Sequence, residues 1–257
     1  MQRRTLILAL ILCVLSAVPI VYAYDLWMET WSQDNIVVVG DLSYDYWLVV
    51  EDDSGTNVTF SYAVSDGVLN INSSRTGTIS EVKYFRIQRK IDLTNVSSAI
   101  FEVRVKLNQT DDTYTQFSIQ TQNLNYLVLL FKKNTFKLYY YNGSGQYDSV
   151  ELMSSVTFDE WHTVKAEIDN RTINIYFDGS IKAQLTTSKD LKDFDIVEIH
   201  HHFGSLSTLN YPNQIYIDYI GFKTQFYDPA LTNAFMQLAI TLAMLGVALS
   251  FVKRAIR

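Results

Sequence analysis

Cysteine is almost missing from this chain, and the one that occurs, Cys13, lies in an apolar N-terminal segment. The remainder of the sequence can therefore form no disulfide bond, which is unusual for an exported domain. Proline is also scarce, with three in 257 residues. Helix-period stretches of useful length are missing between the two ends of the chain, which argues against a helical domain.

Basic residues are few compared with acidic ones. All 27 acidic residues lie between Asp25 and Asp228, where only 16 of the 21 basic residues lie, so this region carries a net charge of −11. Such a surface repels phosphate backbones, and nucleic acid is therefore not an expected partner. About 205 residues are enough for one sizeable core, and we expect a single domain.

Long apolar runs occur only near the two ends. At the N-terminus, two arginines precede an apolar run from Leu6 to Val18, which Pro19 ends. Val21 and Ala23 lie where a signal peptidase requires small residues, so we expect a signal peptide over residues 1–23. An uncleaved signal anchor is the alternative, because apolar residues continue beyond the proline.

The C-terminal apolar run, residues 230–252, has no charged residue and suits one helical crossing of the bilayer. Lys253, Arg254 and Arg257 follow it, and basic residues favour the cytoplasmic side. We therefore expect a type I protein of a cell membrane or viral envelope. Its domain, residues 24–228, would lie outside, and its tail, residues 253–257, inside.

The expected outer domain is rich in glycosylation sequons. Six Asn-X-Ser/Thr sites exceed the number expected by chance and predict a glycosylated surface. They are Asn57, Asn72, Asn95, Asn108, Asn142 and Asn170. An exported domain with many sequons and no cysteine is typical of an archaeal surface protein or of a virus that infects such a cell.

The body of the chain reads as short strands with polar turns, which together with few prolines predicts an all-β sandwich or barrel. The expected strands are Val58–Val64, Val68–Ile71, Phe85–Ile91, Ala99–Leu107, Thr115–Thr121, Tyr126–Phe131, Thr135–Tyr141, His162–Ile168, Ile173–Phe177, Ile181–Leu185, Ile196–Phe203 and Ile215–Phe222. The run YLVLLF is apolar on both faces, as expected of a central strand that is covered on both sides.

One stretch resembles a known family. The series FDEWHTVKAEIDNRTINIYFDGSIKAQL is similar to the consecutive hairpins of laminin-G-like and concanavalin A-like jelly rolls, and SDGVLNINSS, FRIQRKIDLTNVSSAIFEVRVKL and NQIYIDYIGF agree in order. The resemblance covers most of Trp27 to Phe222. It implies an antiparallel β-sandwich of the concanavalin-like jelly-roll type. We also expect Trp161 to anchor its strand in the sandwich interior.

Acidic residues are missing where the enzymes of this superfamily need them. Its laminarinase-like members carry a Glu-X-Asp-X-X-Glu array on one strand, before the hairpin series, and use two of the carboxylates in hydrolysis. No acidic residue lies between Asp112 and Asp148 in this chain. The string DFDIVEIH follows the hairpins, and alternation places Glu198 on the face opposite to Asp193 and Asp195. We therefore predict no enzyme.

Amide and aromatic side chains are present where acids are missing. Alternation puts Gln116 and Gln120 on one face of their strand, and it puts Tyr139 and Tyr141 on one face of another. Amides can bond sugar hydroxyls and tyrosine rings can cover a pyranose face, so these four residues are candidates for carbohydrate binding. The alternative is a solvated sheet surface on which tyrosine is favoured by β-propensity.

Two groups of residues raise the question of a metal. Glu198, His200 and His202 share a strand face but lie about 6.6 Å apart in steps of two, which is wide for one transition metal. The resemblance instead implies calcium at a sheet rim, held by carboxylates. The acidic turns that would serve contain Asp52 and Asp53, or Asp111 and Asp112. Solvated turns have the same composition.

Together these patterns predict a non-catalytic surface protein that binds a glycan or another surface protein. The competing prediction is a structural component of a surface layer or viral envelope that has no small ligand.

Overall fold

The computed structural model describes residues 21–29, 31–77, 82–94, 96, 98–108, 113–121, 124–132, 135–141, 147–187, 190–203 and 213–227. Residues Asp25–Lys223 form one compact unit. The predicted membrane segment at 230–252 and most of the predicted signal peptide lie outside the described residues. Within the described ranges no helix is long and apolar enough to cross a membrane.

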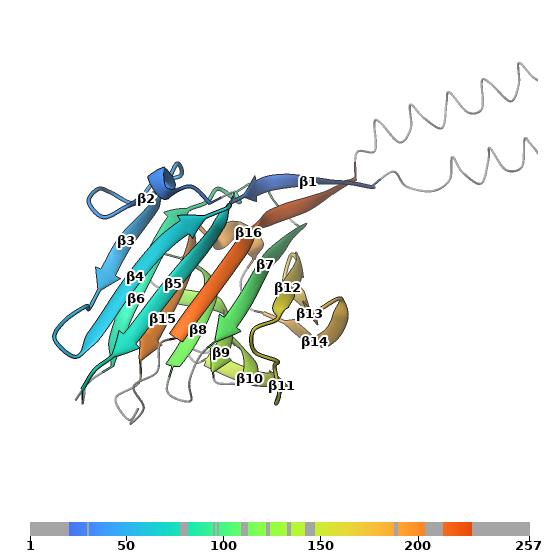
Figure 1. Cartoon of the computed structure of the whole chain (residues 1–257). Helices are drawn as coiled ribbons and strands as arrows, with labels where there is room; N and C mark the ends of the chain where they lie inside the picture. The colour runs from blue at the N-terminus through green and yellow to red at the C-terminus, as the bar shows by residue number, and fades with distance from the viewer. Residues whose placement is uncertain are drawn as a thin grey trace, which may run out of the picture. The chain divides into compact units, whose positions relative to one another are not determined.

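The described chain folds into two β-sheets (Figure 1). Sheet A has the order β14-β13-β12-β7-β16-β5-β4, with β1 also paired to β16. Its strands are β1 (Val21–Met28), β4 (Val58–Ser65), β5 (Val68–Arg75), β7 (Ser98–Asn108), β12 (Trp161–Asp169), β13 (Thr172–Phe177), β14 (Ser180–Thr186) and β16 (Asn213–Tyr227).

Sheet B has the order β11-β10-β9-β8-β15-β6-β3-β2. Its strands are β2 (Ile36–Val37), β3 (Trp47–Asp52), β6 (Lys83–Lys90), β8 (Thr113–Thr121), β9 (Leu124–Lys132), β10 (Thr135–Tyr141), β11 (Tyr147–Met153) and β15 (Ile196–Phe203). The registers are antiparallel apart from the short β2–β3 pair, which is parallel. Two short 3-10 helices, η1 (Gln33–Asn35) and η2 (Leu191–Asp193), are the helical elements of the described residues.

Tight turns close the hairpins that the sequence indicates. Asp66 and Gly67, which join β4 to β5, have φ values of 53° and 75°. Asp178 and Gly179, which join β13 to β14, have φ values of 48° and 76°. Positive φ at both central residues suits the right-handed twist of the flanking strands, and Asp-Gly is a preferred pair for such turns.

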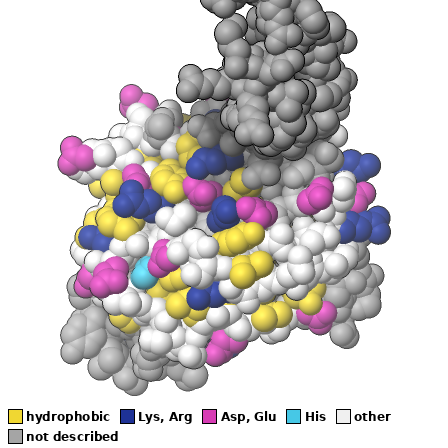
Figure 2. All heavy atoms as spheres, turned by 90° about the vertical axis from the view of Figure 1, so that its right-hand side faces the viewer, with side chains coloured by type: hydrophobic (Ala, Val, Ile, Leu, Met, Phe, Trp, Pro, Cys, Tyr) yellow, Lys and Arg dark blue, Asp and Glu magenta, His cyan; other side chains and the backbone are white. Residues whose placement is uncertain are grey.

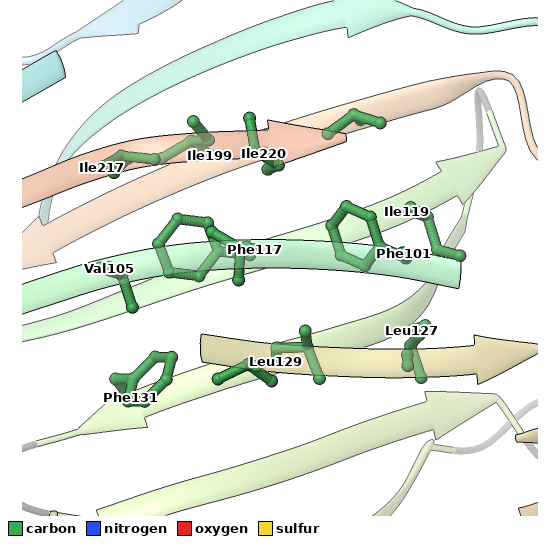
Figure 3. Close-up of a cluster of buried hydrophobic side chains, with 14 of the residues drawn as sticks. Phe101, Val105, Phe117, Ile119, Leu127, Leu129, Phe131, Ile199, Ile217 and Ile220 are labelled. Carbon is green, nitrogen blue, oxygen red and sulfur yellow. The ribbon is translucent and has the colours of Figure 1, made fainter. Parts of the chain in front are cut away.

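The core lies between the two sheets and consists of the apolar residues of each alternating strand. In sheet A, Phe101 and Val105 of β7 are fully buried, and Phe117 and Ile119 of β8 meet them from sheet B (Figure 3). Side chains at intervening positions point away from the core. The antiparallel two-sheet sandwich that the sequence predicts is therefore confirmed.

All twelve predicted strands are present, but four strands of the structure were not predicted. Strand β11 is an edge strand in which residues 148–151 are exposed, and its partly buried apolar residues, Leu152 and Met153, are adjacent in sequence and show no alternation that would mark a strand. Strand β3 has partly buried side chains on both of its faces and no clear alternation. Strand β2 has two residues, and β1 begins within the last three residues of the predicted signal peptide and continues into the predicted outer domain.

The prediction that Trp161 anchors the interior is wrong. Its side chain is 36% exposed on sheet A, where Arg104 lies 5.1 Å and Lys106 5.8 Å from the ring centroid. The reason is parity, since His162 and Val164 point into the core and the tryptophan must therefore point outward. The prediction rested on the tendency of tryptophan to be buried and disregarded the alternation of the strand.

Four of the six sequons can be placed. Asn57, Asn108 and Asn170 are exposed, at a turn or a strand end. Asn72 is half-buried within β5. Asn95 and Asn142 lie outside the described residues, and the glycosylation of all six remains a prediction.

Candidate functional site

The side chains of three of the four predicted binding residues project from the same face of sheet B. Gln116 and Gln120 lie on β8 and Tyr139 lies on β10, with β9 between these strands. Each alternates with core residues, so its side chain points away from the sandwich interior. We call this side the outer face of sheet B. Tyr141, at the end of β10, also packs against the core cluster.

Apolar side chains of β9 lie between the amides and the tyrosine. Val128 is aligned with Ser118 on β8 and with Tyr139 on β10, and Leu130 is aligned with Gln116. Val128 is 5% exposed and Leu130 is 7% exposed, although neither belongs to the core between the sheets. The middle of the outer face of sheet B is therefore withdrawn from solvent.

A buried carboxylate occupies the centre of this face. Glu198, on β15, is 1% exposed, and its Oε2 accepts hydrogen bonds from Gln88 Nε2 at 2.5 Å and Gln120 Nε2 at 3.0 Å. Arg86 NH1 lies 3.8 Å from the same oxygen, while Arg86 NH2 lies 3.3 Å from Glu51 Oε2. The Arg86 guanidinium therefore forms ion pairs with two carboxylates.

Several polar atoms around Glu198 have no protein partner. They are buried, and within the described residues no hydrogen bond reaches Ser118 Oγ, His200 Nε2, either ring nitrogen of His202 or Arg86 Nε. Buried polar groups are normally paired, and each exception needs an explanation such as a bound molecule. These atoms are enclosed, so a polar ligand would bond them once covering side chains, such as Tyr114 against His202, move aside.

The two histidines of this face remain neutral near pH 7. Burial, followed by the Arg86 charge, lowers the pKa of His200 to about 4. Burial lowers the pKa of His202 to about 2. A neutral imidazole carries one hydrogen-bond donor and one acceptor, which is also what a hydroxyl group offers and needs.

Aromatic rings border the histidines. The ring of Tyr84 on β6 lies 5.1 Å from that of His200 and 5.6 Å from that of His202, and the two histidine rings are 5.0 Å apart. Alternation was correct in placing Glu198, His200 and His202 on one face, and His201, between the two histidines, is fully buried on the other.

The outer face of sheet A has a different character. Its charges form close ion pairs, Arg104–Asp218 and Lys223–Glu102 between β7 and β16 and Lys165–Glu167 along β12. Figure 2 views the side on which β12 to β14 lie in Figure 1, and there basic, acidic and apolar side chains are interspersed without gathering by type. Paired, partly exposed charges of this kind are typical of a solvated surface.

The candidate metal residues are engaged locally where they can be placed. Asp52 Oδ1 accepts hydrogen bonds from the backbone and hydroxyl of Ser54, and Asp53 Oδ2 accepts one from the backbone of Tyr84. Asp111 and Asp112 lie outside the described residues. Among those described, no group of three or more acidic, histidine or cysteine side chains is placed to hold a metal ion.

The sequence interpretation missed the central role of Glu198 and its partners. Gln88, Gln120 and Ser118 approach this carboxylate only because β6 and β8 flank β15. The signal that could have found it is a single acid in the apolar strand IVEIHHHF, because a buried carboxylate requires partners.

The sequence and the structure both match known proteins. Residues 80–197 match a laminin G family described as the concanavalin A-like lectin/glucanases superfamily, which confirms the resemblance over that stretch. A comparison with curated proteins gave no match.

Among solved structures, the endo-β-1,3-glucanase of Pyrococcus furiosus has a TM-score of 0.57 at 13% identity, over 82% of this chain and 100% of that one. The laminarinase catalytic domain of Thermotoga maritima has a TM-score of 0.56 at 14% identity, over 79% and 99%. A CBM2 module of the evolved Dit protein of Lactobacillus casei BL23 phage J-1 has a TM-score of 0.53 at 13% identity, over 81% and 98%. At these identities the likeness establishes the jelly-roll fold alone.

Proposed function

We propose that this chain is a non-catalytic, membrane-anchored surface protein whose jelly roll binds glycans through the outer face of sheet B. The observation that carries the proposal is the group of buried, unpartnered polar atoms around Glu198, contributed by Ser118, His200, His202 and Arg86. The partly exposed rings of Tyr84 and Tyr139 supply apolar surface for the faces of sugar rings.

The placement of the carboxylates supports binding rather than hydrolysis. Glycoside hydrolases hold two carboxyl groups about 5–10 Å apart on either side of the bond to be cleaved. Here Glu51 and Glu198 both contact Arg86, so each faces a guanidinium rather than a shared substrate bond. The described outward positions of β8, β9 and β10 contain no acidic residue.

Replacement of Tyr139 or Gln120 by alanine is expected to weaken glycan retention about fivefold to tenfold, because each removes one stacking or hydrogen-bonding contact of modest strength. Wild-type affinity should itself be weak, with Kd between about micromolar and millimolar, so that attachment depends on many copies acting together. The measurement is retention of the full chain, purified in mild detergent, on a panel of immobilised polysaccharides.

Matched controls lie on the outer face of sheet A. Tyr176→Ala and Gln214→Ala remove the same side-chain types from partly buried positions and should leave retention unchanged. If wild type is retained on no polysaccharide, or if the variants at 139 and 120 bind like wild type, glycan binding is refuted. A structural role in a surface layer or viral envelope, or binding of a surface protein, would then take its place.

The anchoring part of the proposal rests on the uncharged run at 230–252 and the basic residues after it. A tag placed after Arg257 should stay protected when protease is added to intact cells, while the domain before the run is removed. Digestion of the tag together with the domain would contradict a cytoplasmic tail.

A further inference from the structure

We infer that the site around Glu198 selects neutral glycans and rejects anionic ones, and that the buried Glu198 carboxylate makes this selection. The inference rests on the proposed function, because it specifies the class of glycan that the outer face of sheet B would accept. It concerns uronates and other acidic sugars as competitors of uncharged hexoses.

The first step is the charge of the site. Two of the groups closest to the Glu198 carboxylate are the neutral amides of Gln88 and Gln120, which donate hydrogen bonds but bring no positive charge. Among the described residues, Arg86 is the cation that pairs with Glu198, at 3.8 Å, and it lies closer to Glu51, at 3.3 Å. Glu198, Glu51 and Arg86 together therefore carry one net negative charge.

The second step is burial. Glu198 is 1% exposed, so water and salt ions screen its charge poorly. An anionic sugar group bonded by Ser118, which is aligned with Glu198 across the β8–β15 pair, would lie beside this carboxylate. Its own charge would have to lose solvation next to a like charge, which disfavours binding.

The third step is that the histidines bring no positive charge to offset that of Glu198. His200 and His202 stay uncharged over the physiological range, because burial favours their neutral forms. They can pair with hydroxyl groups, which both donate and accept, but they offer no cation to a carboxylate or sulfate. The unpartnered atoms are therefore suited to a polyhydroxylated, uncharged ligand.

Further charged groups of this face are Lys90 at the end of β6, which is partly buried and aligned with Ile196, and residues on β9 to β11. Lys137 on β10 forms an ion pair with Glu151 on β11 at 3.4 Å, and these side chains are 34% and 48% exposed. Lys132 is exposed at the end of β9, where it is aligned with Tyr114. Exposed lysines are solvated and screened by salt, so they act on a bound sugar more weakly than the buried carboxylate does.

The experiment compares matched polysaccharides. The full chain in mild detergent is applied to a neutral β-1,3-glucan and its carboxymethyl derivative, and to a neutral galactan and polygalacturonate. Wild type should be retained at least tenfold better on the neutral member of a pair that it binds. The preference should persist at about 0.5 M salt, where general repulsion by the acidic surface is screened.

Glu198→Gln should bring the ratio of neutral to anionic retention close to one, because it removes the buried charge but keeps an oxygen that can accept from Gln88 and Gln120. Glu151→Gln removes the same charge from an exposed position of sheet B and should leave the ratio as in wild type. Thermal unfolding checks that both variants fold. If Glu198→Gln does not fold, the salt series on the wild-type protein still tests the inference.

Each result has a distinct meaning. Equal or better retention on the anionic polymers, a preference that disappears at high salt, or an unchanged ratio in a folded Glu198→Gln variant overturns the selection while leaving glycan binding intact. No retention on any of the four polymers overturns the proposed function and the selection with it.

Discussion

Replacement of Glu29 by alanine is expected to lower the free energy of unfolding by about 3–5 kcal/mol, because it leaves a buried cation without its partner. Glu29 is 2% exposed, and its Oε2 pairs with Arg89 NH1 at 2.5 Å, where the Arg89 side chain is 13% exposed. The same oxygen accepts a hydrogen bond from Trp47 Nε1 at 3.0 Å, and Oε1 accepts one from Asn35 at 3.2 Å.

This cluster fastens the segment that precedes β2 to sheet B. The Arg89 guanidinium also lies 4.8 Å from the ring centroid of Trp27, and Trp27 and Trp31 both pack on Trp47, which is fully buried. Desolvation of Arg89 lowers its pKa, and the Glu29 charge opposes that shift. Without the Glu29 carboxylate, the Arg89 guanidinium must be hydrated in the interior or move to the surface. Either change disturbs the packing of the three tryptophans around it.

Denaturant and thermal unfolding of the full chain measure the effect, which should lower Tm by roughly 10 °C for a domain of this size. Glu160→Ala removes an exposed carboxylate and should change stability by about 0.5 kcal/mol or less. The double variant Glu29→Ala with Arg89→Met should recover part of the loss, because it removes the buried charge altogether. A Glu29→Ala protein as stable as the Glu160→Ala control would contradict this account.

Local alternation predicted most of what depends on one strand at a time. It placed Gln116 and Gln120 opposite Phe117, and it placed His201 opposite Glu198, because neighbouring side chains of a strand point to opposite faces whatever lies beside them. The same rule would have placed Trp161 outside, had it been applied there instead of the expectation that tryptophans fill cores.

Pairings between distant strands could not be predicted in this way. Glu198 meets Gln88 and Gln120 from segments 110 and 78 positions away, through registers that no local pattern encodes. Likewise, nothing near Glu29 in sequence indicates Arg89 as its partner, 60 positions later. The candidate site is therefore a product of sheet order, which explains why its rim was predicted and its centre was not.

His201 should make the domain sensitive to acid, because its ring is enclosed between the sheets and its hydrogen-bond partners are two hydroxyl groups. The side chain is fully buried, with Nε2 2.6 Å from Ser73 Oγ of sheet A and Nδ1 3.2 Å from Thr115 Oγ1 of sheet B. Aromatic rings of Phe60 and Phe203 lie beside it. Burial, followed by the nearby charge of His200, lowers the pKa of His201 to about 3.

The direction of the pH dependence follows from that pKa. In the unfolded chain this histidine binds a proton below about pH 6.5, whereas the folded protein resists the proton until about pH 3. Stability is therefore complete above pH 6.5 and falls as the pH falls through the window from 6.5 to 3. Each such histidine lowers the free energy of unfolding by about 1.4 kcal/mol per pH unit within this window, or by about 2–3 kcal/mol in total at pH 4.5. His200 and His202, whose pKa values are also lowered, act in the same direction.

Urea unfolding of the full chain at pH 7, 6, 5 and 4 should thus show stability decreasing by up to about 4 kcal/mol per pH unit below pH 6, the slope of three protons. His201→Gln retains a neutral donor and acceptor for Ser73 and Thr115, and it should lower the slope by about 1.4 kcal/mol per pH unit. Carboxylates that titrate near pH 4 affect both proteins alike, so the difference between the two curves isolates His201. If the wild-type and His201→Gln curves stay parallel from pH 7 to pH 4, the buried imidazole is not the group that takes up the proton on unfolding.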